Sequence, residues 1–230
     1  MAIILHIETA TEVCSVAVAN NYKLLALKET EGGNSHSANL TIFIEEVMKQ
    51  AGLTLKDLDA VAVSKGPGSY TGLRIGVSVA KGFCYGLDIP MIAVDTLKAM
   101  AWSASDGNDA DVLYCPMIDA RRMEVYAAIY DKNNNTFREV KADIVDELTY
   151  KEYLDKNIVM FFGNGAEKCR EILTAHPNAR ILDNNFTSSV GMITLAADKY
   201  EHKQFEDVAY FEPFYLKDFI AAKPIVKGLH

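Results

Sequence analysis

A strand, turn and strand pattern occurs twice along this chain, once near the start of each half, and it constrains the fold more than any other feature. In the first half, two mostly apolar, β-branched segments flank a short turn that begins with Glu8. In the second half, two more flank a turn that begins with Asp119. With a third segment after each pair, strands are expected at 2–7, 13–19 and 23–29, and at 112–118, 124–130 and 136–140. Connections this short predict two antiparallel three-stranded meanders.

Helices that alternate with short buried strands follow each meander. In the first such helix, apolar residues recur at helical spacing from Leu40 to Ala51. Ser35 or Ser37 can cap its start, and Gly52 ends it. The remaining elements are expected as strands at 59–64, 91–94 and 158–162, and as helices at 69–85, 96–105, 147–154, 163–175 and 190–200.

This order of elements predicts an α/β fold with two lobes. A meander followed by alternating helices and strands, present twice, favours the actin-like ATPase or sugar-kinase (ASKHA) architecture, with duplicated mixed sheets and flanking helices. A Rossmann sheet fits less well, because its first strand would run directly into a helix. The polar stretch 105–111 is the expected junction. We therefore expect an N-terminal lobe at 1–104 and a C-terminal lobe at 105–230, whose last helix can pack back on the first lobe.

Charge narrows the range of partners. The 230 residues carry 23 Lys and Arg against 31 Asp and Glu, a net charge of −8, without a basic run. Cations that neutralise phosphates supply most of the non-specific affinity for nucleic acids, so the chain is not expected to hold RNA or DNA unaided. Four isolated cysteines and the lack of a long apolar stretch are typical of a cytoplasmic protein.

The first turn is a candidate for a degenerate phosphate loop. Glu8, Thr9 and Thr11 occupy the place where an actin-like nucleotide site would have Asp, Gly and Thr, so that backbone amides approach phosphates. Ala10 replaces the glycine, and we expect it to be strained if the turn requires a positive φ. The competing interpretation is an ordinary hairpin turn with a partly buried acid, which makes ATP hydrolysis by this chain alone doubtful.

The segment from Gly66 to Gly76, with the sequence GPGSYTGLRIG, is the most distinctive in the chain. It matches neither the P-loop nor the dinucleotide-binding pattern. Ser69 or Thr71 at a helix start could hold an anion through the helix dipole and backbone amides. Equally, the segment could be a tight turn from strand to helix in which a hydroxyl caps the helix.

Gly72, Gly76 and Ala80 form a stripe of small residues on one helix face. Glycine in a helix costs about 1 kcal/mol relative to alanine, so close packing against another element is expected to compensate. The neighbouring element could belong to this chain or to a partner.

No catalytic residue and no metal site are predicted. His36 has Leu40 one helical turn later instead of a second histidine, and Ser78 falls in the middle of a helix. A further cluster contains four charges within six residues. These charges could orient a phosphate, or they could form solvent-exposed ion pairs with one another across the two strands. It consists of Asp119, Arg121, Arg122 and Glu124.

Several motifs together carry a resemblance to a known family. They are IETAT at 7–11 followed by CSVAV at 14–18, His36-Ser37, the glycine-rich segment with AKG at 80–82, DARR at 119–122 with EVY at 124–126, and PFYL at 213–216. In these motifs the chain resembles the TsaB (YeaZ) family, glycoprotease-like proteins of tRNA threonylcarbamoyladenosine (t6A) synthesis.

The resemblance implies a non-catalytic scaffold or activator. It would bind the catalytic subunit TsaD, act with the ATPase TsaE, form a homodimer in isolation and meet tRNA only through the complex, away from membranes. No intrinsic cofactor is expected, although ATP or ADP could lodge at the complex interface. We hypothesise that the partner interface is a helix bundle built from Leu40, Phe43, Ile44, Val47, Gly72, Arg74, Gly76 and Ala80. The alternatives are an active metallopeptidase-like or kinase-like hydrolase, and an interaction module outside tRNA modification.

Overall fold

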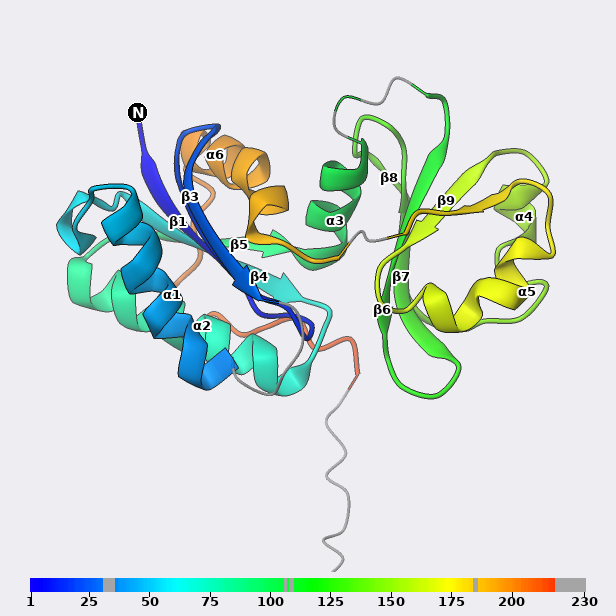
Figure 1. Cartoon of the computed structure of the whole chain (residues 1–230), viewed down its shortest axis with the longest axis horizontal. Helices are drawn as coiled ribbons and strands as arrows, with labels where there is room; N and C mark the ends of the chain where they lie inside the picture. Colours follow the sequence, from blue (N-terminus) through cyan, green and yellow to red (C-terminus); the bar gives the residue numbers. More distant parts are fainter. Residues whose placement is uncertain (31–35, 106, 108–109, 184–185, 218–230) are drawn as a thin grey trace, which may run out of the picture.

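The two expected lobes are present, each with its own five-stranded sheet (Figure 1). The structure is a computed structural model, and it describes residues 1–30, 36–105, 107, 110–183 and 186–217. The first sheet has the order β3-β2-β1-β4-β5, and the second has the order β10-β9-β6-β7-β8. The sheets therefore share one plan, in which a meander is extended by two parallel strands.

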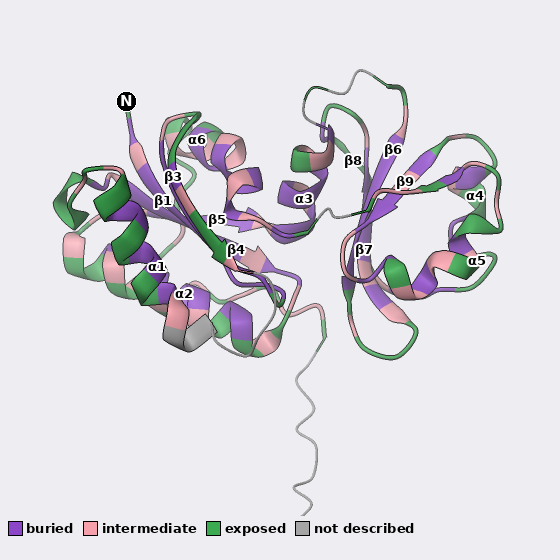
Figure 2. Ribbon diagram, in the orientation of Figure 1, coloured by how far each residue is buried: buried purple, intermediate pink, exposed green. Residues whose placement is uncertain are grey.

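The strands of the first sheet are β1 Ile3–Glu8, β2 Cys14–Asn20, β3 Lys23–Thr30, β4 Ala60–Gly66 and β5 Met91–Asp95. β1 pairs antiparallel with β2, where Ile4 lies opposite Ala19, and parallel with β4. The side chains of β1 and β4 are almost entirely buried because helices cover both faces of the sheet (Figure 2). The predicted meander and both parallel strands are confirmed within one or two residues.

Two helices, α1 His36–Gln50 and α2 Tyr70–Leu87, cover one face of this sheet. The apolar stripe of α1 packs mainly over β2 and β3, in a core cluster with Val16 and Val18 of β2 and Ala26 of β3. α1 ends as predicted, because Gly52 adopts a φ of +69° and the chain turns away. The proposed caps Ser35 and Ser37 lie outside the residues whose side chains are described.

The other face of the first sheet is covered by α3 Thr96–Ser105, the 3-10 helix η3 Ser189–Met192 and α6 Ile193–Glu201. Met192 and Ala196 pack there against Ile4 and Ile92. α6 thus lies on the first lobe although it comes late in the sequence, and Lys199 donates to the carbonyl oxygen of Ala93 at 2.6 Å. The second lobe therefore ends before residue 187, and the linear division at 104/105 does not describe the contents of each lobe.

The second sheet consists of β6 Leu113–Asp119, β7 Glu124–Tyr130, β8 Thr136–Ile144, β9 Val159–Phe162 and β10 Ala179–Ile181. One of its faces is covered by short helices, α4 Lys151–Leu154, the 3-10 helix η2 Glu167–Cys169 and α5 Arg170–Thr174. The other face is covered by α3, whose Leu97 and Met100 pack with Tyr114 and Ile118 of β6. The predictions of longer helices at 147–154 and 163–175 were wrong in extent, because residues 163–166 form a turn against β6. β10 was missed, since three residues show no recognisable strand period.

After α6 the chain remains on the first lobe. The 3-10 helix η1 Leu55–Asp57 lies at the end of the first lobe that is far from the second lobe. The segment 206–217 runs along the first lobe toward the second lobe. The amide of Glu206 donates to the carbonyl oxygen of Met91, and the amide of Phe214 donates to that of Lys65 at 2.7 Å. Within the described ranges, no helix has the length and apolar character needed to span a bilayer.

Candidate functional site

The turn between β1 and β2 lies at the end of the first sheet that faces the second lobe, and the glycine-rich segment packs directly on it. The hydroxyl of Thr9 donates to the carbonyl oxygen of Gly72 at 2.8 Å. The amide of Ser69 donates to the carbonyl oxygen of Ala10 at 2.7 Å. The turn is therefore hydrogen-bonded to the chain itself at the place where an actin-like site would offer groups to phosphates.

Three glycines of this segment explain the close fit. A methyl group on Gly68 or Gly72 would overlap the carbonyl oxygen of Ala10 or Thr9, and one on Gly76 would overlap the Thr9 hydroxyl. The small-residue stripe thus packs within the molecule, and the intramolecular interpretation is confirmed. The prediction that Gly72 and Gly76 face a partner was wrong.

Glu8 lies at the base of the turn and is 1% exposed. Its Oε1 accepts a hydrogen bond from the amide of Ala10 at 2.6 Å. Burial raises the pKa of Glu8 to about 7, against the opposing effect of hydrogen bonds from Ala10, Ser64 and Thr9. The hairpin interpretation is therefore the better one, with an acid more buried than expected. Ala10 is not among the residues with positive φ, so the expected strain is absent there.

A short segment between the second lobe and α6, which we call the strap, covers the turn. We define the strap as residues 187–189, which lead into α6. The hydroxyls of Thr11 and Thr187 are 2.5 Å apart, and the amide of Ser189 donates to Ser15 Oγ at 3.0 Å. Thr11 is thus bonded within the chain. No local sequence pattern predicted the strap, because Thr11 and Ser15 lie more than 170 residues away from its residues.

The remaining loop candidates, Ser69 and Thr71, differ in role. Ser69 is the N-cap of α2, and its Oγ accepts a hydrogen bond from the amide of Gly72 at 3.3 Å. Thr71 is exposed. The capping interpretation is therefore confirmed for Ser69, and no phosphate needs to be invoked to explain the hydroxyl.

The second lobe repeats this docking with different residues. Gly163 and Gly165 follow β9, while Gly66 ends β4 and Gly68 follows it. A methyl group on Gly163 would overlap the carbonyl oxygen of Met117 in β6. The amide of Gly165 donates to that same oxygen at 3.0 Å. Comparison of the sequences GPG and GNG, each at the end of a buried strand, could have revealed this relation.

The β6–β7 turn remains open to solvent. Lys168 pairs with Asp119, and Lys217 pairs with Glu124. The predicted ion pairs within this cluster were therefore wrong, because both acids pair with lysines from elsewhere in the chain. Arg121 and Arg122 are exposed at the tip, and neither forms an ion pair with another described residue.

The predicted interface requires a further correction. The side chains of Leu40, Phe43, Ile44 and Val47, like Ala80 of α2, are buried in the core of the first lobe, because α1 turns its apolar stripe toward its own sheet. They are therefore not available to a partner in this fold.

Arg74 alone of the predicted interface residues is exposed. Its guanidinium lies 4.1 Å from the ring centre of Tyr70, and its Nε donates to the hydroxyl of Tyr215 at 3.2 Å. Tyr215 belongs to the segment 206–217, so Arg74 helps to hold that segment against α2.

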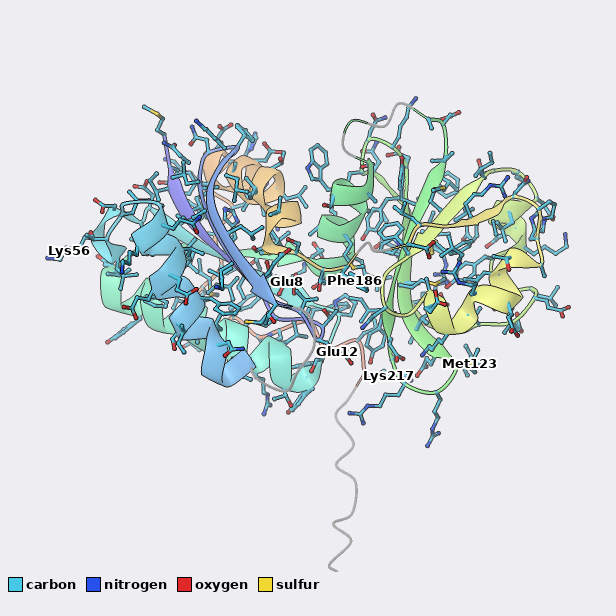
Figure 3. The ribbon with its side chains drawn as sticks, in the orientation of Figure 1. Glu8, Glu12, Lys56, Met123, Phe186 and Lys217 are labelled. Atoms are coloured by element: carbon cyan, nitrogen blue, oxygen red, sulfur yellow. The ribbon has the colours of Figure 1, made fainter. Side chains whose placement is uncertain are left out.

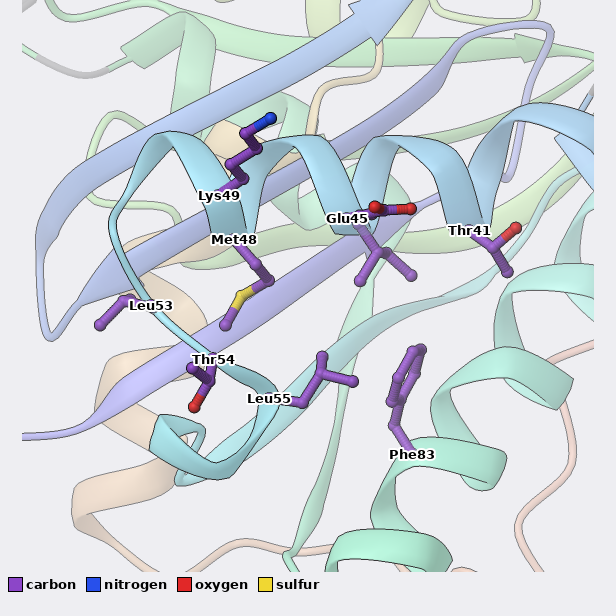
Figure 4. Close-up of a pocket in the computed structure, with 9 residues that line it drawn as sticks. Thr41, Glu45, Met48, Lys49, Leu53, Thr54, Leu55 and Phe83 are labelled. Atoms are coloured by element: carbon purple, nitrogen blue, oxygen red, sulfur yellow. The ribbon is translucent and has the colours of Figure 1, made fainter.

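The outward faces of α1 and α2 offer other groups. Ile42 and Tyr85 are 51% and 86% exposed. Gly82 and Gly86 have no atom within 4 Å of a methyl group placed on them. Beside these faces, an apolar groove of about 510 Å³ lies between α1, η1 and Phe83 of α2 (Figure 4).

No three His, Cys, Asp or Glu side chains come together as candidate metal ligands within the part of the chain that the structure describes. The side chain of His36 lies outside that part. The four cysteines are buried and unpaired.

Solved structures of similar shape define the class of protein. YeaZ from Pseudomonas aeruginosa superposes with a TM-score of 0.80 at 24% identity, covering 94% of this chain and all of that one. An ADPNP-bound activator of 2-hydroxyisocaproyl-CoA dehydratase from Clostridium difficile superposes with a TM-score of 0.53 at 10% identity, covering 88% of this chain and 97% of that one. Together with the duplicated sheets, these place the chain among proteins of two-lobed, actin-like ATPase fold.

Sequence comparison is more specific. Residues 26–224 match the family model described as TsaD: tRNA N6-adenosine threonylcarbamoyltransferase. The tRNA threonylcarbamoyladenosine biosynthesis protein TsaB of Bacillus subtilis is 31% identical over 74% of both chains, and that of Haemophilus influenzae is 27% identical over 96% of both. TsaB of Escherichia coli is 40% identical over 57% of this chain, a match that spans about half of that relative (56%). The chain belongs to the TsaB family of tRNA threonylcarbamoyladenosine biosynthesis proteins.

Proposed function

We propose that this chain is a scaffold and activator in t6A synthesis, binding a TsaD-type catalytic subunit and making no covalent bond itself. The packing of the glycine-rich segment on the first turn carries the proposal. Gly68, Gly72 and Ser69 fill the space in which backbone amides would approach phosphates, and the strap adds a second layer of contacts. Family membership supplies the process, and the occupied turn supports a role other than phosphate transfer.

The outward faces of α1 and α2 are the proposed docking surface. Gly82 and Gly86 lower the helix propensity of α2 by about 1 kcal/mol each, and no described residue from another element lies within 4 Å of a methyl group placed on them. Small residues allow another helix to approach closely, while Ile42 and Tyr85 supply apolar surface that a partner would bury. In isolation, the same faces would pair two copies of this chain.

The rest of the assembly follows from the family. We propose that a TsaE-type ATPase acts with the pair, that tRNA is held mainly by the partners, and that any ATP or ADP lodges between subunits. The expected compartment is the cytoplasm.

Co-purification with the TsaD-type protein of the same organism tests the docking surface. Gly82→Phe should weaken association at least tenfold while the thermal midpoint of the isolated chain changes little, since the phenyl ring would project into open space. Glu171→Phe, at an exposed position of α5 in the second lobe, is the matched control and should bind normally. Unchanged association of the Gly82 variant would contradict the docking surface.

Gly76 is unsuitable for this test. A bulky side chain there would collide with Thr9, so loss of association by such a variant would not separate a folding defect from a lost interface.

A second measurement addresses catalysis. The purified chain, free of partners, should neither hydrolyse ATP or peptides nor form t6A in a tRNA transcript, measured by mass spectrometry of the digested RNA. Turnover by the isolated chain that disappears in Glu8→Gln would instead support the hydrolase alternative.

A further inference from the structure

The tip of the β6–β7 turn combines two features that are unusual for this chain. Arg121 and Arg122 are both exposed, and both have positive φ, at 71° and 53°. Glycine and asparagine are the residues that adopt this backbone most readily, and arginine is costly there. The hairpin itself gains nothing from two arginines, so their side chains need another explanation.

The charges around the tip leave the two guanidinium groups unneutralised. Asp119 and Glu124 flank the arginines, but Lys168 already pairs with the first and Lys217 with the second. Among the described residues of the tip, two carboxylates therefore face four cations, a local net charge of +2 on a chain whose total is −8. The tip stands apart as a positive patch on an acidic protein.

The backbone adds donors. The amide of Arg121 donates to Asp119 Oδ1, and that of Ala120 donates to the carbonyl oxygen of Glu124. The amides of Arg122 and Met123 form no such bond with a described residue. Met123 is 40% exposed, which leaves this side of the turn accessible.

From this arrangement we infer that the Arg121–Arg122 turn is a phosphate-binding site for the backbone of RNA. The inference rests on the proposed function for the origin of the RNA. Guanidinium groups bind phosphate oxygens through paired hydrogen bonds, and side chains that diverge from a convex tip suit successive phosphates along a strand. A single protein carboxylate could not use this many donors.

Two phosphate contacts give little affinity alone. This agrees with the acidic composition, which disfavours unaided binding of tRNA. The turn would add to the grip of a partner that holds most of the RNA.

The test compares variants that keep the turn geometry. Arg121→Asn with Arg122→Gly removes both charges and places residues that favour positive φ, so the fold should be retained. The control, Lys56→Asn with Lys203→Gly, makes the same change in net charge on the first lobe, and Lys203 also has positive φ, at 54°. Figure 3 shows Lys56 at the opposite end of the molecule from Met123.

Fluorescence anisotropy with a labelled tRNA transcript would be recorded between about 20 and 200 mM salt, for the chain alone and with its TsaD-type partner. The arginine variant should lower the slope of log K against log salt by up to about 2, since each phosphate contact contributes about 0.9. Arg121→Lys with Arg122→Lys should keep most of the slope but bind several-fold more weakly. The control should match the wild type.

Equal slopes for the arginine variant and the control would overturn the inference. Loss of ATP binding alone in the arginine variant would also overturn it, because the site would then bind a nucleotide. Loss of partner association alone would overturn it too, because the site would then bind an acidic protein surface. A changed slope for the chain alone, combined with no binding of the TsaD-type protein, would support the phosphate site and contradict the proposed function.

Discussion

Thr9 and Gly72 lie in direct contact, with the Thr9 hydroxyl donating to the carbonyl oxygen of Gly72 at 2.8 Å and the backbone of one residue against that of the other. This contact joins the end of β1 to the first turn of α2. It requires the residue at position 72 to lack a side chain. The glycines of this segment therefore allow α2 to pack closely on the end of β1.

A pair of glycine substitutions in α2 should change stability in opposite directions. Gly72→Ala should destabilise the protein by about 1–3 kcal/mol, because the methyl group would overlap the Thr9 backbone and force it to shift. Gly82→Ala should stabilise it by about 1 kcal/mol, since it gains helix propensity in open space. Urea unfolding of both variants measures the difference. If Gly72→Ala stabilised the protein instead, the contact between Thr9 and Gly72 would have room for a methyl group.

Two buried titratable groups in β1 should have compensating effects on pH stability. Burial lowers the pKa of His6 to about 3 from 6.5, and neither ring nitrogen has a hydrogen-bond partner among the described residues. Its contribution to stability is present above pH 6.5 and is lost as pH falls toward 3. The raised pKa of Glu8, about 7 against 4.5, acts oppositely, with a contribution present below pH 4.5 and lost as pH rises toward 7.

Between pH 4.5 and 6.5 these two slopes cancel. Glu8→Gln removes one of them, so the variant should lose about 1.4 kcal/mol per pH unit relative to the wild type as pH falls through this range. Urea unfolding at four pH values measures it. The double variant His6→Leu with Glu8→Gln should again run parallel to the wild type. A parallel course for Glu8→Gln alone would show that Glu8 keeps its ordinary pKa, because the His6 contribution is the same in both proteins.

The ion pair of Arg138 and Asp143 in β8 should matter far more than an exposed one. Both side chains are 9% exposed, two N–H···O bonds of 2.8 and 2.6 Å join them, and the Tyr150 hydroxyl donates to the same carboxylate. Asp143→Ala should cost about 3–5 kcal/mol, because it leaves a buried guanidinium unpaired.

The exposed pair of Lys151 and Asp155 serves as the matched comparison. Its side chains are 52% and 46% exposed, so Asp155→Ala should destabilise the protein far less than Asp143→Ala. A double-mutant cycle with Arg138→Leu would isolate the coupling in the buried pair. Similar losses for Asp143→Ala and Asp155→Ala would refute the assigned difference.

Local sequence was sufficient for the elements of the first lobe. The alternation and β-branching of β1 to β3, and the helical spacing of apolar residues in α1, depend on neighbours in the sequence, so their type and approximate bounds were predictable. The Ser69 cap was predictable for the same reason. β10 and the short helices of the second lobe were not, because a few residues carry too little pattern.

What each apolar or small face contacts was a different question. Spacing showed that Leu40 and Ile44 share a face of α1, but the same stripe would serve a partner or the chain's own sheet. In the structure that face packs mainly on β2 and β3. The structure likewise places Gly72 against Thr9, 63 residues away, and leaves Gly82 open.

By itself the sequence determined the two-lobed α/β plan, the family and the absence of a recognisable catalytic motif, since periodicity and motifs are properties of neighbouring residues. Only the tertiary structure decided that the first turn is sealed, that Ser189 returns to Ser15 across 174 residues, and that Arg121 and Arg122 form no ion pair with another described residue. Those outcomes depend on which distant surfaces meet and exclude water. Such a choice is settled by the packing of the whole chain and leaves no local pattern.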